Sequence, residues 1–265
     1  MLLTQNIAGM PFSGADVGGF FGNPSTELLE RWYQAAIYQP FFRAHAHIDT
    51  KRREPWLFGA TTLKRTRAAV MRRYQVLPLV YTAYHDAFLC GAPVMAPLWS
   101  LFPTDVKTFA IDDTFMLGAF NDGGALLIKP VATEAESQMV SAMVYLPHGV
   151  WYDVRTTKIN GAQTFGRRLD SPPGGVDVKV PLDAEEIPTF QHGGVIVPRK
   201  MRLRRSSKLM RHDPYTLVVA LDTAAHSQGE LYLDDEISQS PAYVPSQTTH
   251  HLLFHFHESS LSSSR

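Results

Sequence analysis

The sequence predicts an α/β segment followed by an all-β remainder, because its texture changes once along the chain. Within the first ninety residues, apolar side chains recur at helical spacing on either side of a short β-like stretch. After residue 92, short β-rich segments alternate with Gly and Pro, which is typical of an antiparallel sandwich. The two textures meet at residues 91–93, so we expect a domain boundary near residue 92.

Two helices are expected in the first part. One covers residues 24–38, with Asn23 as its N-cap and Pro24 at the first helical position. The other covers about residues 62–89, and Pro78 is expected to kink or split it. We expect the basic residues of this second helix to form its outer, solvated face: Lys64, Arg65, Arg67, Arg72 and Arg73.

The stretch "PFFRAHAH", residues 40–47, is expected to be a short strand between the two helices. A loop, a helix, a strand and a long helix in this order suit part of a parallel α/β sheet or barrel. Arg43, His45 and His47 would then share one face at the end of the strand where such folds carry ligands. Equally, Arg43 could pair with a nearby carboxylate while the two histidines cap loops.

An isolated aspartate, Asp16, lies between Gly14 and the Gly18-Gly19 pair. Glycine allows a tight backbone path and a close approach of other groups, which a loop over a pocket floor needs. An ordinary turn aspartate fits the same spacing, so both interpretations stay open.

Metal binding is an alternative for this region, because His45, His47 and Asp49 alternate. Two histidines on one strand can both reach a divalent ion. A barrel metallohydrolase using His45 and His47 would need further ligands from elsewhere. His85 is the only other histidine of the first ninety residues, and it falls in the second expected helix.

The β-rich part contains seven segments that we expect to form strands. They are "ALLIKPVA", "SAMVYLP", "VWYDV", "VDVKVPL", "TFQHGGVIVP", "YTLVVALD" and "GELYLDD". From Glu236 the chain becomes rich in Ser, His and Gln, and we expect this tail to be disordered or misassembled.

Composition excludes some classes of function. The 265 residues, 45% of them hydrophobic, suffice for one large domain or two smaller ones. With 25 basic and 25 acidic side chains, the chain has no net charge to attract nucleic acid or an anionic membrane. No apolar stretch approaches the length of a membrane span, and no basic segment marks a signal peptide. Cys90 is the only cysteine, so no intrachain disulfide is expected.

Several of the stretches above resemble glycoside hydrolase family 31. These are "GADVGGF", "RWYQ", "YQPFFRAHAH", "KRREPW", "VMAPLW", "FPTDVKTFAIDD", "VWYDV", "IPTFQHGGVIVPR", "MRLRRSS" and "GELYLDD". They occur in the order of the family and cover roughly residues 8–235, most similarly to its glucosidase II type.

The resemblance implies a fold. The family folds as a (β/α)₈ TIM barrel followed by β-sandwich domains. Residues 1–92 would be the C-terminal part of the catalytic barrel, that is, its last β/α units. Residues 93–198 would be the proximal antiparallel β-sandwich, and residues 199–265 a partial distal β domain with an unrecognised tail.

The resemblance also implies an activity, the hydrolysis of terminal α-linked glucose with retention. Retention needs two carboxyl groups about 5 Å apart, a nucleophile and a general acid/base. Both family aspartates lie upstream of "GADVGGF", and their Trp-x-Asp-Met-Asn-Glu and Trp-x-Gly-Asp-Asn patterns are absent here. We therefore expect no catalytic residue and no turnover in this chain alone.

Three residues match the substrate-binding positions of the family. By resemblance, Asp16 and His45 hydrogen-bond the hydroxyl groups of the non-reducing-end glucose, and Phe20 lines the pocket. Arg43 would support this wall by pairing rather than by touching sugar. No metal or cofactor is implied.

The resemblance further implies an α-glucoside or a glucosylated N-glycan as substrate, a non-catalytic β subunit as partner, and the endoplasmic reticulum as location. The chain shows no signal peptide or retention signal of its own. Two other functions stay open. One is a truncated, non-catalytic isoform that acts as a sugar-binding or interaction module, and the other is the metallohydrolase described above.

Overall fold

The structure is a computed structural model. It describes residues 1–118, 123–132, 141–155, 157–159, 162–164, 166–182, 184–238, 249–257 and 259–264.

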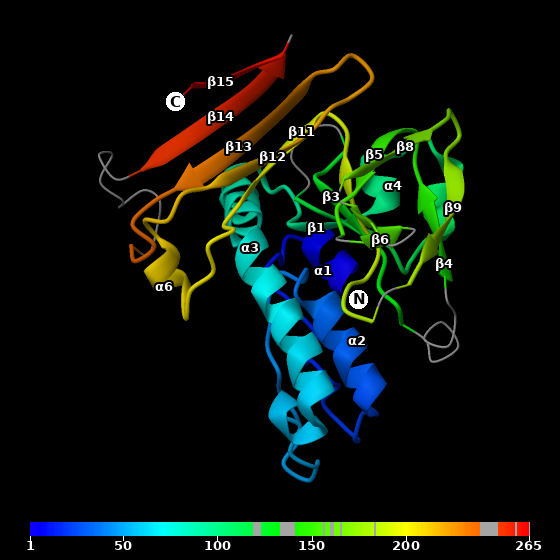
Figure 1. Cartoon of the computed structure of the whole chain (residues 1–265), viewed down its shortest axis with the longest axis vertical. Coiled ribbons are helices and arrows are strands. Elements are labelled where there is room, and N and C mark those ends of the chain that lie inside the picture. Colours follow the sequence, from blue (N-terminus) through cyan, green and yellow to red (C-terminus); the bar gives the residue numbers. More distant parts are fainter. Residues whose placement is uncertain are drawn as a thin grey trace.

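Among the described residues, helices are concentrated before residue 111, and one short helix follows later. Their bounds are α1 (Leu2–Ile7), α2 (Thr26–Ala36), η1 (Pro55–Phe58), α3 (Ala60–Cys90), α4 (Leu98–Leu101), η2 (Val106–Ala110) and α6 (Ser207–Met210). Figure 1 shows α2 beside the lower part of α3, and the upper end of α3 against the C-terminal strands. Across the described residues, no helix combines the length and the apolar composition that a membrane crossing needs.

Helix α2 confirms the first expected helix, but its cap differs from the prediction. The helix begins at Thr26, and the hydroxyl of Ser25 accepts a hydrogen bond from the Leu28 N–H at 3.2 Å. Ser25 is therefore the N-cap. The side chain of Asn23 instead accepts from the Lys51 N–H at 2.8 Å, which ties the start of the helix to a later loop.

Helix α3 confirms the second expected helix and is longer than predicted. It runs for 31 residues and contains Pro78, so the proline does not split it. Pro78 removes one helical hydrogen bond, but it is buried among residues that pack this part of the helix. The helix ends at Gly91, whose left-handed backbone, with φ of 75°, forms its C-cap.

The strands of the described residues form two larger sheets and two separate two-stranded pairs. Their bounds are β1 (Met95–Pro97), β2 (Phe115–Leu117), β3 (Leu126–Ile128), β4 (Ser141–Leu146), β5 (Gly149–Asp153), β6 (Thr157–Ile159), β7 (Ala162–Thr164), β8 (Arg167–Ser171), β9 (Val176–Pro181), β10 (Thr189–His192), β11 (Val195–Arg199), β12 (Thr216–Ala220), β13 (Ser227–Leu233), β14 (His250–His257) and β15 (Ser260–Ser264). Each of the seven expected β segments overlaps at least one of these strands.

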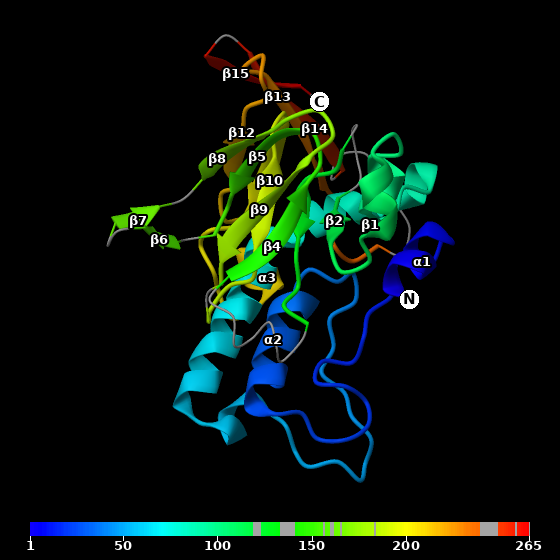
Figure 2. The same ribbon diagram turned by 90° about the vertical axis from the view of Figure 1, so that its right-hand side faces the viewer.

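One sheet has the strand order β1-β2-β3-β10-β5-β8, and the other has the order β12-β11-β13-β14-β15. The pairs β4-β9 and β6-β7 stand apart from these two sheets. Pairing is antiparallel except between β11 and β13. Figure 2 shows the strands above and the pair α2 and α3 beneath them.

The expected strand at residues 40–47 is not formed, and that prediction is wrong. This stretch instead lies beside residues 13–20 through three backbone hydrogen bonds, from Phe41 to Ser13, from Val17 to Arg43 and from His47 to Phe20. Later residues of one segment bond to later residues of the other, so the two segments run parallel. A regular parallel ladder needs evenly spaced bonds, and these three are not. The two segments therefore run together without becoming strands.

The expectation of a disordered tail is wrong for residues 249–257 and 259–264, while residues 239–248 lie outside the described residues. Strand β14 pairs along β13, and β15 pairs along β14. The reason is a period of two in β14, where Leu252, Phe254 and Phe256 pack in one apolar cluster with Leu231. The sequence thus carries a strand signal within a Ser- and His-rich stretch.

The largest cluster of buried apolar side chains includes residues from both sides of the expected boundary near residue 92. One cluster of buried apolar side chains contains Leu29 of α2, Leu79 of α3, Leu126 of β3 and Val197 of β11. A second cluster lies around Trp151 and Phe190, within the six-stranded sheet and the β4-β9 pair. The helices therefore share their main core with the sheets that follow them.

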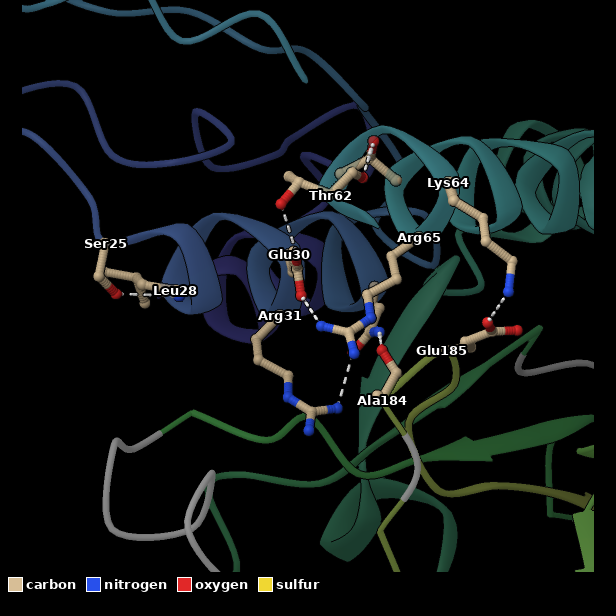
Figure 3. Close-up of polar contacts among 11 residues, drawn as sticks. Ser25, Leu28, Glu30, Arg31, Thr62, Lys64, Arg65, Ala184 and Glu185 are labelled. Carbon is tan, nitrogen blue, oxygen red and sulfur yellow. Dashed lines mark hydrogen bonds and ion pairs between the residues drawn. The ribbon is translucent and has the colours of Figure 1, made fainter. Parts of the chain in front are cut away.

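Polar contacts join the two helices to each other and to a loop of the β part (Figure 3). Buried Glu30 of α2 accepts from the Thr62 hydroxyl at 2.6 Å and from Arg65 at 2.7 Å. Gln34 donates to the Ala184 carbonyl at 2.8 Å. Lys64 pairs with Glu185 at 2.7 Å, also across this junction.

Candidate functional site

The loop that carries Asp16 is shaped by glycines. A Cβ at Gly14 would lie 1.9 Å from the Phe41 carbonyl oxygen, so only glycine allows this approach of the two segments. Gly18 and Gly19 have φ of 87° and 82°, in the left-handed region. The Gly19 N–H donates to the Asp16 carbonyl at 2.9 Å, which closes the turn directly after the aspartate.

The Asp16 carboxylate is bound on one side by Arg43. The arginine donates from Nε at 3.2 Å and from a terminal nitrogen at 2.7 Å, both to Oδ1. The side chains of Arg43 and Asp16 are 50% and 20% exposed. Oδ2 has no hydrogen bond to any described residue, so Arg43 orients the carboxylate and leaves one oxygen free to accept from a ligand.

Phe20 brings the two neighbouring histidines together. Its ring centroid lies 5.5 Å from that of His45 and 5.7 Å from that of His47, the second in a T-shaped contact. The Phe20 carbonyl also accepts from the His47 N–H at 2.8 Å. The structure therefore places Phe20, His45 and His47 on one small surface beside the Asp16 turn.

Side chains of residues 40–47 alternate in direction as expected, although no strand is formed. His45 and His47 both face Phe20, while Phe42 turns the other way and its ring lies 6.0 Å from that of Tyr33 in α2. His47 and Asp49 contact each other at 3.3 Å. Across the described ranges, no three His, Cys, Asp or Glu side chains are grouped to hold a metal ion, so the metallohydrolase interpretation finds no third ligand there.

Two arginines that support this region were missed by the sequence reasoning. Arg53 is 8% exposed and donates to the carbonyls of Gly18, Gly19 and Gly22 at 2.6–2.8 Å. It lies in the "KRREPW" stretch, but no spacing separates it from its two basic neighbours.

Arg73 is the second of these arginines, and its expected place on the outer face of α3 is wrong. It is 8% exposed and donates to the carbonyls of Ile37, Gln39 and Pro40 at 2.7–2.8 Å. Burial lowers its pKa to about 10, which leaves it charged at neutral pH. The signal was present, because Arg73 follows Ala69 by four residues on the buried face of the helix.

A separate group of titratable side chains lies where α3 meets β13 and β14. His251 of β14 contacts Glu230 of β13 at 2.6 Å, and the His85 ring stacks on Tyr232 at 3.8 Å. Burial, together with the charge of Glu230, raises the pKa of Asp86 to about 7. Burial and the neighbouring His251 lower the pKa of His85.

Two hollows of the described surface lie away from Asp16. One, of about 280 Å³, is bounded by α2, α3 and residues 185–187. The other, of about 270 Å³, lies at the edge of β13 and β14 beside His226 and His257. Neither is lined by Asp16, Phe20 or His45, so neither hollow belongs to the Asp16 region.

The surface formed by Asp16, Phe20 and His45 has the chemical groups that bind a polyhydroxyl ligand. A free carboxylate oxygen accepts hydrogen bonds, an imidazole donates or accepts, and an aromatic ring offers an apolar face. Both histidine nitrogens of His45 lack a hydrogen bond to any described residue, and the residue is exposed. Such a ligand can therefore be bound and oriented by Asp16, Phe20 and His45. The buried arginines Arg53 and Arg73 can hold the loops that carry these residues.

Comparison with known proteins shows the family of the chain. The glycosyl hydrolases family 31 TIM-barrel domain matches residues 1–83, and the glycosyl hydrolase family 31 C-terminal domain matches residues 91–197. Neutral alpha-glucosidase AB of Dictyostelium discoideum is 47% identical over 242 residues, which cover 90% of this chain and 23% of that protein.

Solved structures cover nearly the whole chain. The glucosidase II alpha subunit in its alpha3-Glc2-bound form has a TM-score of 0.86 and 40% identity, over 99% of this chain and 26% of that one. A second structure is the heterodimeric complex of ER glucosidase II, which contains the catalytic subunit and the binding domain of the regulatory subunit. Its TM-score is 0.85 and its identity 39%, over 99% of this chain and 26% of that one. The chain thus spans about a quarter of the length of these relatives.

The fold is the end of a TIM barrel followed by antiparallel β-sandwich-like sheets, as the sequence predicted. Two successive domains of one family cover residues 1–83 and 91–197 in the family's order. The chain therefore belongs to glycosyl hydrolase family 31.

Proposed function

We propose that this chain is the C-terminal portion of a retaining α-glucosidase of the glucosidase II type, which hydrolyses terminal α-linked glucose. The observation that supports this most is the meeting of Asp16, Phe20 and His45 on one surface, although 29 positions separate the first from the last. In the proposed pocket, Asp16 accepts from a glucose hydroxyl, His45 contacts a second hydroxyl, and Phe20 packs against the ring.

Arg43 has a supporting role in this proposal. It engages one oxygen of the Asp16 carboxylate through two donors, so the free oxygen is held in one direction. Fixing an acceptor before the sugar arrives lowers the entropic cost of binding. Because the guanidinium is already bound to Asp16, Arg43 acts on the sugar through that carboxylate.

The nucleophile and the acid/base would come from the part of the barrel that precedes this segment. In the division we propose, residues 1–92 end the catalytic barrel, residues 93–198 form the proximal sandwich and residues 199–265 form part of a distal β domain. On its own the chain would be a sugar-binding fragment without turnover, because retention has no covalent step without its nucleophile.

The names of the relatives support a proposal about the cellular setting. The curated relative is named a neutral alpha-glucosidase, and the solved ER complex pairs a catalytic subunit with a regulatory subunit. By this analogy we propose trimming of glucosylated N-glycans in the endoplasmic reticulum together with a non-catalytic β subunit. The Asp16 surface would then receive the terminal glucose of the glycan.

A chimera tests the proposal. The matching 242-residue segment of the Dictyostelium neutral alpha-glucosidase AB is replaced by this chain, and hydrolysis of p-nitrophenyl α-D-glucoside is measured. Asp16→Ala and His45→Ala should each lower kcat/KM at least about tenfold, because each leaves a sugar hydroxyl unpaired at about 1–3 kcal/mol. Asp112→Ala, at an exposed aspartate in the β part, is the control and should have no effect. Unchanged kinetics in both site variants would remove Asp16 and His45 from the site.

A further inference from the structure

The strap formed by residues 51–54 passes beneath the Asp16 turn, and only one of its two arginines is buried. Arg52 has a 75% exposed side chain and pairs with Glu54 at the surface. Arg53, the next residue, is 8% exposed and turns its guanidinium into the turn. The Lys51 N–H donates to Asn23, which fixes the strap against the far end of the same loop.

The guanidinium of Arg53 satisfies three carbonyls at once. One terminal nitrogen donates to the oxygens of Gly18 at 2.8 Å and Gly19 at 2.6 Å, and the other donates to that of Gly22 at 2.7 Å. All three glycines have left-handed backbones, with φ of 87°, 82° and 70°. A buried carbonyl without a donor costs free energy. Gly18 is buried and Gly19 is partly buried, so the turn depends on the donor that Arg53 supplies to their carbonyls.

The turn that Arg53 holds is the one that carries the proposed sugar contacts. Asp16 precedes Gly18 by two residues, and its carbonyl accepts from the Gly19 N–H at 2.9 Å. Phe20 follows Gly19 directly, and its own carbonyl accepts from the His47 N–H at 2.8 Å. A shift of the turn would therefore move Asp16 and Phe20 together and would break the contact with the histidine segment.

The fit between Arg53 and the turn is tight. A Cβ at Gly18 would lie 3.2 Å from a terminal nitrogen of Arg53 and 3.1 Å from the Leu29 side chain. A planar guanidinium can reach acceptors on both sides of the turn, whereas an ammonium group is a single point on a flexible stem. Lysine at this position would keep the charge but not the three-way contact.

We propose that Arg53 is a positioning residue of the glucose pocket, whose guanidinium fixes the Gly18–Gly22 turn in the conformation that presents Asp16 and Phe20 to the sugar. This rests on the proposed function. Arg53 does not touch the sugar, since both of its terminal nitrogens donate to the turn and its Nε is buried.

The first test reads the turn itself in the 265-residue chain, by amide hydrogen exchange at Gly19 and His47. Arg53→Lys and Arg53→Ala should each accelerate both amides at least about tenfold, because the bonds of these amides depend on the held turn. Arg52→Ala is the matched control, since it removes a neighbouring arginine that does not contact the turn. Millimolar guanidinium ion should restore slow exchange in Arg53→Ala, and ammonium ion should not.

The second test reads function in the chimera described above. Arg53→Lys should lower kcat/KM for the chromogenic glucoside at least about tenfold, as misplacement of positioned groups does, while Arg52→Ala should not. Arg53→Lys serves where Arg53→Ala fails to fold. Slow exchange in Arg53→Lys, or a folded Arg53→Lys chimera with wild-type kinetics, overturns the proposal. An inactive chimera with the unaltered segment would instead count against the proposed function, while the exchange data would still report whether Arg53 holds the turn.

Discussion

The shared core makes a specific prediction about cooperativity. Leu79 of α3 is 1% exposed and belongs to the cluster that also contains strands of both larger sheets. Truncation of a fully buried leucine costs about 2–5 kcal/mol through lost burial and the cavity left behind. Because the cluster joins the two parts, Leu79→Ala should destabilise residues on both sides of residue 92 by the same amount.

Fluorine NMR can follow both parts at once. The four tryptophans are Trp32 in α2, Trp56 in η1, Trp99 in α4 and Trp151 in β5, so 5-fluorotryptophan gives two signals from each part. In urea, all four native signals should disappear at one midpoint. A loss of about 3 kcal/mol with a slope of about 3 kcal/mol/M lowers that midpoint by about 1 M in Leu79→Ala.

A matched control lies on the same helix. Leu89 is 63% exposed, so Leu89→Ala should move the midpoint by no more than about 0.2 M, because surface changes of this kind cost about 0.5 kcal/mol or less. If Leu79→Ala lowered the midpoint of the Trp32 and Trp56 signals while the Trp151 signal kept its own, the two parts would unfold independently. That result would refute the shared core.

Three further predictions concern individual contacts. The raised pKa of Asp86 means that the folded chain keeps a proton which the unfolded chain loses near pH 4. The free energy of unfolding should therefore fall as the pH rises from about 4 to about 8, and Asp86→Asn should reduce this fall. The lowered pKa of His85 acts in the opposite sense below about pH 7.5, where the unfolded imidazole gains a proton. Urea midpoints at pH 6.5 and 8 are therefore compared between the unaltered chain and Asp86→Asn, which share His85. Gly14→Ala should cost about 1–3 kcal/mol and accelerate exchange of the Phe41 amide, since its Cβ would lie 1.9 Å from a backbone oxygen; normal exchange would refute the close approach. Arg43→Ala should cost less than about 1 kcal/mol in the same urea assay, because both partners of its ion pair are partly exposed; a larger loss would show a structural role.

The elements that the sequence predicted well are those with long periodic patterns. Helices α2 and α3 follow from apolar residues at helical spacing, and the expected β segments follow from their β-branched composition between Gly and Pro. The cap of α2 was misplaced by two residues because both Asn23 and Ser25 are good caps. In the structure Ser25 accepts from the Leu28 N–H, while Asn23 is engaged by the Lys51 N–H of a later loop.

The errors arose where a neighbour decides the structure. Residues 40–47 have a strand-like composition, but a strand needs a regular ladder, and their backbone hydrogen bonds with residues 13–20 are too unevenly spaced to form one. Residues 250–257 read as a polar tail because histidines alternate with the apolar side chains. In the structure the apolar set pairs and packs on β13, so the alternation was a half-buried strand.

The candidate site was predictable only in part. Asp16, Phe20, Arg43 and His45 were identified from their motifs, and the structure places them together, although their roles with sugar stay proposals. Arg53 could not be separated by pattern from the exposed arginine beside it. The role of Arg53 depends on the carbonyls of three glycines with left-handed backbones, which all accept from its guanidinium. The spacing of residues in the sequence does not reveal this arrangement.

The most direct test of the central claim is a comparison of α-glucosidase turnover among three proteins. These are the isolated 265-residue chain, the Dictyostelium neutral alpha-glucosidase AB without its matching 242-residue segment, and the chimera that joins the two. If this chain supplies the glucose-orienting part of the pocket and the preceding barrel supplies the catalytic aspartates, only the chimera should hydrolyse p-nitrophenyl α-D-glucoside. Turnover by the isolated chain, or a folded chimera without turnover, would contradict the account.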